Sequence, residues 1–113
     1  MIDLKVLERL KKELVLNNNP FPHLISNNFL PQDIVKQAEK EFIEFNELKD
    51  AGGYRYENLK YYFNDFSKMP KTIKTLISFF HSEEFILFLE KKFNLLNIIP
   101  DWSLWGGGMH SSK

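Results

Sequence analysis

The sequence has 113 residues and a mass of 13.4 kDa, which is the size of one domain. Its 43% hydrophobic and 27% charged residues predict a folded globular chain and exclude a disordered or fibrous one. Its fifteen basic and fifteen acidic side chains cancel, which argues against nucleic acid or anionic membranes as partners. Without cysteine there is no disulfide or thiolate metal site, and no apolar run approaches the roughly 18 residues of a membrane span. No signal peptide is recognisable at the N-terminus, so the expected location is the cytoplasm.

The first half of the chain predicts two amphipathic helices. Apolar residues recur at helical spacing over about 3–15, with Asp3 as the expected N-cap, and again over about 31–45, with Pro31 in the first helical position. Between them, His23–Ser26 follows two prolines that hold the backbone extended, and we expect a short strand there. From residue 46 to 69 the periodicity is lost, which predicts an irregular loop with one strand-like piece in the aromatic stretch 54–63.

The second half predicts two further helices and a closing strand. Helical spacing covers about 70–80 and 83–93, and Ser82 is the expected N-cap of the latter. Residues 94–100 read as a connection, and Asp101–Trp105 reads as a strand that runs into three glycines and His110. The many Phe side chains on these helices indicate core packing, although aromatics at 15% of the chain also fit a surface that more protein covers.

No complete catalytic constellation stands in the sequence. The three histidines, His23, His81 and His110, lack the short spacing of metal ligands, and Ser111 beside His110 is adjacent in sequence only. The run Gly106–Gly108 is followed by too few residues for the helix that a phosphate loop needs. Glycines at this point therefore indicate either a place where another backbone approaches the strand or a place where a ligand does.

Three segments resemble a known family. Residues 19–23 (Asn-Pro-Phe-Pro-His), 28–31 (Asn-Phe-Leu-Pro) and 104–110 (Leu-Trp-Gly-Gly-Gly-Met-His), with Phe85 and Leu89-Glu90 in a helix between them, resemble the front portion of 2-oxoglutarate- and iron(II)-dependent oxygenases of the prolyl 4-hydroxylase-like kind. The segments occur in the family's order and spacing, and the last of them is the strongest.

The resemblance implies an α+β fold: a helical support layer over about 1–93, then the first strands of a double-stranded β-helix (jelly roll) over about 100–113, as a single incomplete, truncated domain. It implies Fe(II) and 2-oxoglutarate as cofactors, and hydroxylation of a peptide or small molecule. The family's iron ligands, a His-x-Asp pair and a distant His, do not occur in these 113 residues, so the chain alone is expected to be inactive. The resemblance places His110, Gly108 and Trp105 as candidates for the cosubstrate or substrate pocket.

Two expectations about function follow. The first is the N-terminal part of such an oxygenase, active only when another chain or segment supplies the iron-binding strands. The alternative is a small non-enzymatic helical interaction module that uses exposed aromatic side chains. In either case an open apolar strand edge near Trp102, Leu104 and Trp105 predicts self-association or a complementary chain.

Overall fold

The structure, a computed structural model, describes residues 2–50, 60–105 and 107–112. Within this part of the chain lie four α-helices: α1 (Lys5–Glu13), α2 (Gln32–Glu44), α3 (Lys71–Phe80) and α4 (Glu83–Phe93). Their bounds differ from the predicted ones by at most two residues at either end. The four predicted helices are therefore confirmed.

The starts of the helices follow local chemistry. Ser82 is the N-cap of α4, and its hydroxyl accepts a hydrogen bond from the backbone N–H of Phe85 at 3.2 Å. At α1 the N-cap position is held by Leu4 instead of the predicted Asp3. The Asp3 carboxylate nevertheless accepts from the backbone N–H of Lys5 at 2.9 Å, so it still satisfies a free donor of the first turn.

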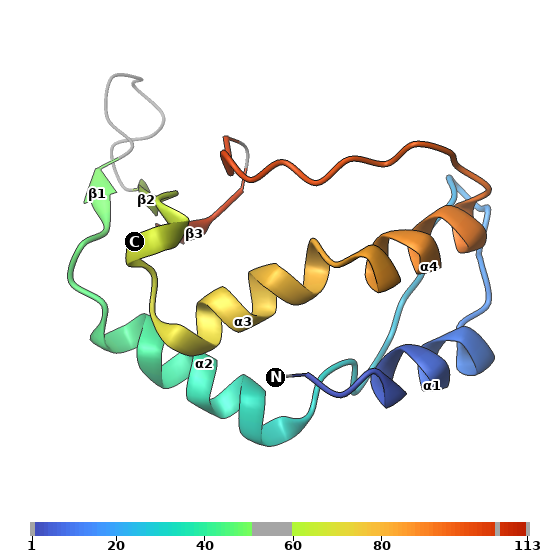
Figure 1. The fold of residues 1–113 in the computed structure, drawn as a ribbon, viewed down its shortest axis with the longest axis horizontal. Helices are drawn as coiled ribbons and strands as arrows, with labels where there is room; N and C mark the ends of the chain where they lie inside the picture. The colour runs from blue at the N-terminus through green and yellow to red at the C-terminus, as the bar shows by residue number, and fades with distance from the viewer. Residues whose placement is uncertain (1, 51–59, 106, 113) are drawn as a thin grey trace.

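The helices pack in pairs, α1 beside α4 and α2 beside α3, with α3 and α4 joined end to end through His81 (Figure 1). Between α1, α4 and the C-terminal half of α3 lies a first hydrophobic core, in which Leu7 and Leu10 are fully buried. Its aromatic members Phe79, Phe85 and Phe88 contact one another at ring-centroid distances of 5.3 and 5.8 Å. Phe85 and Phe88 of the Phe-rich stripes thus belong to the core, as predicted, whereas Phe80 is 38% exposed.

A small antiparallel sheet lies beside the N-terminal half of α3 (Figure 1). Its order is β1 (Lys49–Asp50), β2 (Lys60–Phe63) and β3 (Met109–Ser112). The register sets Phe63 opposite Met109 and Tyr62 opposite His110. Because successive side chains in a strand point to opposite faces, these two pairs lie on opposite faces of the sheet.

A second hydrophobic core joins the sheet to the helices. Its buried members are Phe63, Met69, Leu104 and Met109. Partly buried side chains of α2, α3 and the segments beside them pack against it: Phe42, Phe45, Leu48, Phe66, Ile73 and Ile77. The helices therefore cover the face of the sheet that carries Phe63 and Met109.

Two predicted strands are wrong. Asp101–Trp105 contains a turn, because the Asp101 carboxylate accepts from both the backbone N–H and the hydroxyl of Ser103, at 3.0 and 2.6 Å. The strand near this end is β3, which begins after the glycines. His23–Ser26 forms only an isolated bridge between His23 and Asn17, because no further residue of this segment pairs with another strand.

The α+β class is confirmed, whereas the described residues do not show a jelly roll or double-stranded β-helix. The strand-like piece expected in 54–63 is present as β2, and residues 54–59 of that stretch lie outside the described part. Among the described helices, none has the length and apolar character needed to cross a membrane.

Candidate functional site

His110 lies on the face of the sheet opposite to the helices, and its side chain is exposed. Its Nε2 donates a hydrogen bond to the carbonyl of Gly107 at 2.7 Å, since a carbonyl can only accept. This contact holds the ring with its proton on Nε2. In the neutral ring Nδ1 is then the acceptor, so His110 can receive a hydrogen bond from a molecule above this face.

Gly108 occupies a place where two backbones approach closely. Its φ is +96°, a conformation that side chains rarely tolerate, and a Cβ at this position would lie 2.6 Å from the carbonyl oxygen of Phe63. The neighbouring Gly107 differs, because a Cβ there would meet only the Leu104 side chain at 3.9 Å. At Gly108, then, the backbone alternative from the sequence is the one that the structure supports; Gly106 lies outside the described residues.

The third candidate, Trp105, lies in the segment before the glycines. Its side chain is 87% exposed, whereas its neighbour Leu104 has a φ of +54° and is buried in the second core. The turn that precedes it is locally stabilised. Hydrogen bonds from the hydroxyl and backbone N–H of Ser103 hold the pKa of the Asp101 carboxyl below its ordinary value.

The three histidines have separate surroundings. His81 is the C-cap residue between α3 and α4, and its ring meets Trp102 edge-on at a centroid distance of 4.3 Å. His23 contacts the carbonyl of Phe21 through Nδ1 at 2.7 Å. In the part of the chain that the structure describes, no group of three His, Asp or Glu side chains is placed to hold a metal ion.

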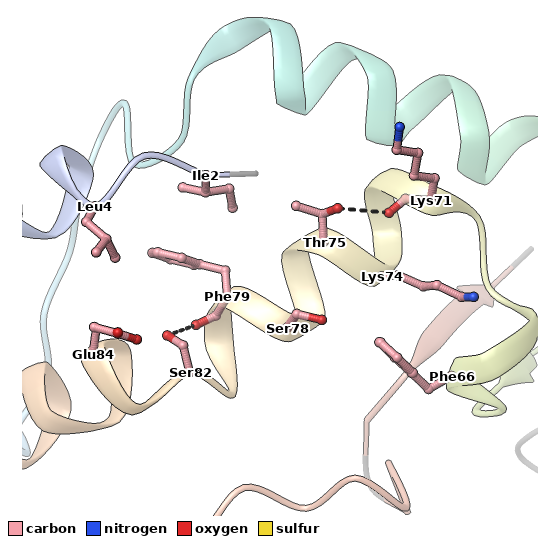
Figure 2. Close-up of a pocket in the computed structure, with 10 residues that line it drawn as sticks. All are labelled: Ile2, Leu4, Phe66, Lys71, Lys74, Thr75, Ser78, Phe79, Ser82 and Glu84. Atoms are coloured by element: carbon pink, nitrogen blue, oxygen red, sulfur yellow. Dashed lines mark hydrogen bonds between the residues drawn. The ribbon is translucent and has the colours of Figure 1, made fainter.

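A pocket that the sequence did not indicate lies along one face of α3 (Figure 2). It has a volume of about 620 Å³, within the range of small-molecule sites. Its lining combines one stripe of α3 with parts of the N-terminal segment, the turn before α3 and the start of α4: Ile2, Leu4, Phe66, Lys71, Lys74, Thr75, Ser78, Phe79, Ser82 and Glu84.

Two hydroxyl groups in this pocket already bond to helix carbonyls. The Thr75 hydroxyl donates to the carbonyl of Lys71 at 3.1 Å, and the Ser82 hydroxyl to that of Phe79 at 2.6 Å (Figure 2). The Lys74 ammonium lies 5.9 Å from the ring centre of Phe66, at the end of the pocket away from Leu4. The pocket can hold an apolar molecule, but its described side chains do not include a nucleophile beside a base.

An exposed apolar strip follows α4. We use the name 95–105 strip for its five most exposed large side chains: Leu95, Leu96, Ile99, Trp102 and Trp105. The segment that carries them runs from the end of α4 back to the sheet, apart from the body of α3 (Figure 1). Of the five, only Trp102 has an aromatic contact in the described structure, with His81 and with Phe66.

Comparisons with known proteins assign no relative. The chain matches no protein-family model, and no curated protein or solved structure is significantly similar to it.

Proposed function

We propose that this chain is the N-terminal part of a 2-oxoglutarate- and iron(II)-dependent oxygenase of the prolyl 4-hydroxylase-like kind, whose reaction is the hydroxylation of a peptide or small molecule. The observation that carries the proposal is the two-sided character of the small sheet. Phe63 and Met109 face the helices, while Tyr62 and His110 face away from them. In a jelly roll with a helical support layer, the face away from the helices is the interior of the barrel.

The proposal gives a role to each candidate residue of the resembling segment. The stretch 104–110 brings Gly108 against β2 and presents His110 on the open face. His110 is thus the proposed contact to the cosubstrate or substrate. Gly108 is proposed to shape that pocket through the backbone, and Trp105 to border it from the segment before the strand.

The residues present do not fit the metal. The described part of the chain offers no set of ligands for Fe(II), and the sequence contains no His-x-Asp pair. The proposal therefore requires that the iron and 2-oxoglutarate ligands come from a further segment or a second chain. It assigns to these 113 residues the support and one wall of the site.

The test begins with the natural reading frame beyond the codon for Lys113 and with the protein that it encodes. We expect a His-x-Asp pair about one strand further on, and release of succinate from 2-oxoglutarate by that protein in the presence of Fe(II). His110→Ala should lower turnover at limiting cosubstrate by about tenfold, the effect of one lost hydrogen bond. The control His23→Ala, which changes a histidine far from His110 in the sequence, should leave this turnover unchanged. A reading frame without iron ligands, or equal effects of the two variants, contradicts the proposal.

A second candidate function, the non-enzymatic interaction module, rests on a different observation. The 95–105 strip presents large apolar side chains to solvent, with Leu96 at 86% and Trp105 at 87% exposure. Large apolar side chains that a folded protein leaves in solvent are the kind that a contact with another molecule would cover. A reading frame that lacks iron ligands, together with a protein that releases no succinate, favours this candidate over the oxygenase.

A further inference from the structure

The pocket along α3 has a charged side chain at each end. The Lys74 ammonium lies at the end beside Phe66, and the Glu84 carboxylate comes from the first turn of α4 at the end beside Leu4 (Figure 2). Between these ends the wall is formed mainly by apolar side chains of the N-terminal segment and of α3. A pocket of this kind distinguishes the two ends of an elongated ligand.

The Lys74 ammonium is available to a ligand. Within the described part of the chain it has no acidic partner, and it lies over the ring of Phe66 at 5.9 Å from the ring centre. Lys71 differs, because its ammonium is directed toward α2 (Figure 2), where its charge helps to lower the pKa of the Glu41 carboxyl. Lys74 is also partly buried, so water screens its charge less than that of a fully exposed lysine.

The Ser78 hydroxyl provides a second donor. Ser78 lies one helical turn after Lys74 on the same face of α3, and its hydroxyl is directed toward the Lys74 end of the pocket (Figure 2). The hydroxyls of Thr75 and Ser82 donate to helix carbonyls, whereas the described residues offer the Ser78 hydroxyl no such partner. An ammonium beside a hydroxyl suits a carboxylate, whose two oxygens both accept hydrogen bonds.

The length of the helix sets the size of the ligand. At about 1.5 Å per residue, α3 rises by about 7–8 Å from Lys74 to Phe79, and the pocket continues past Phe79 to Leu4. An extended alkyl chain advances about 1.25 Å per carbon, so about eight to ten carbons reach from the ammonium to the far end. The volume of about 620 Å³ also lies in the range of small-molecule sites.

We propose that this pocket binds a small amphiphilic carboxylate, with the carboxylate on Lys74 and Ser78 and the apolar chain extending toward Leu4. The pocket favours an anion over a cation because Glu84 is exposed, so water screens its charge, whereas Lys74 is partly buried. The inference is independent of the oxygenase and of the interaction module, because the pocket contains none of the residues assigned to either.

The first experiment compares three probes in calorimetric titration of the whole chain, each below its micelle concentration: decanoate, decanol and decyltrimethylammonium. We expect decanoate to bind at a single site at least tenfold more tightly than the other two. Decanol lacks the charge-assisted hydrogen bond to the ammonium, and the cation is repelled by it. In amide NMR spectra the shifts caused by decanoate should be largest between Lys74 and Phe79 and small in β3.

The second experiment changes the pocket. Lys74→Met should weaken decanoate binding about tenfold and leave decanol binding unchanged. Lys36→Met is the matched control, because it removes the same charge from an exposed position of α2 outside the pocket. Ser78→Trp should fill the pocket and abolish the binding of both probes. Since Ser78 is exposed, this variant should keep the helical circular dichroism of the wild type.

Four results would overturn the proposal. They are decanol that binds as tightly as decanoate, equal losses in Lys74→Met and Lys36→Met, NMR shifts confined to β3, and the absence of saturable decanoate binding. If the last result came with retention of the chain on phosphatidylglycerol vesicles, the pocket would belong to a lipid surface instead.

Discussion

Substituting Gly108 by alanine tests whether the glycine is required by the close approach of β3 to β2. An alanine at φ +96° carries the backbone strain of a left-handed residue, about 1–2 kcal/mol. Its Cβ would also lie 2.6 Å from the carbonyl oxygen of Phe63 and 3.2 Å from the Cα of Asn64, so backbone must move on one side. Together we expect a loss of about 2–4 kcal/mol in the free energy of unfolding.

The neighbouring glycine provides the control. Gly107→Ala meets only a flexible Leu104 methyl group at 3.9 Å and has no positive φ, so it should be neutral or stabilise by up to about 1 kcal/mol. Urea unfolding followed by circular dichroism measures both variants, and the melting temperature of the Gly108 variant should fall by about 4 °C or more for each kcal/mol. A Gly108→Ala protein within about 0.5 kcal/mol of wild type, or one no worse than Gly107→Ala, would refute the reasoning.

Three further predictions concern other parts of the chain. Ser82→Ala removes the acceptor for the Phe85 N–H and should destabilise the protein by about 1 kcal/mol in urea unfolding; no change would mean that water replaces the cap. Burial raises the pKa of the Glu41 carboxyl, but its hydrogen bond from Thr72 and the charge of Lys71 outweigh burial and place the pKa below its ordinary value of 4.5. This stabilisation is present above pH 4.5 and is lost as the pH falls through the lowered pKa, so the stability difference between wild type and Glu41→Gln should shrink in acid; a difference independent of pH contradicts it. The chain of 113 residues should bind Fe(II) or 2-oxoglutarate no more tightly than about millimolar, or about −4 kcal/mol, and one tight stoichiometric site in calorimetric titration would contradict this.

The helices were predictable because their information is local. Apolar spacing along α4 and a serine before it are both visible within a dozen residues, and the predicted range 83–93 is the observed one. The sheet was not predictable in this way. β2 and β3 pair across more than 45 residues of chain, and nothing within Met109–Ser112 alone indicates its partner.

The error at Asp101–Trp105 has a similar cause. The apolar residues there suggested a strand. The backbone N–H and the hydroxyl of Ser103 instead donate to the Asp101 carboxylate, which favours a turn over strand pairing, and Leu104 adopts a positive φ. Of the residues that the sequence singled out as pocket candidates, His110 lies in β3 and Gly108 directly before it. The pocket along α3 was missed, because its walls come from separate segments and the only sequence signal is the polar stripe from Lys71 to Ser78.

Helix α3 takes part in both hydrophobic cores, with Leu76 and Phe79 in the first and Ile73 and Ile77 in the second. The helix is thus a common wall between α1 and α4 on one side and the sheet on the other. Complete opening of α3 requires both cores to open, so in hydrogen-exchange measurements the middle of α3 should be the slowest part of the chain. Opening of the sheet alone should release β2 and β3 first, and a substitution on α3 should alter exchange at both ends of the molecule.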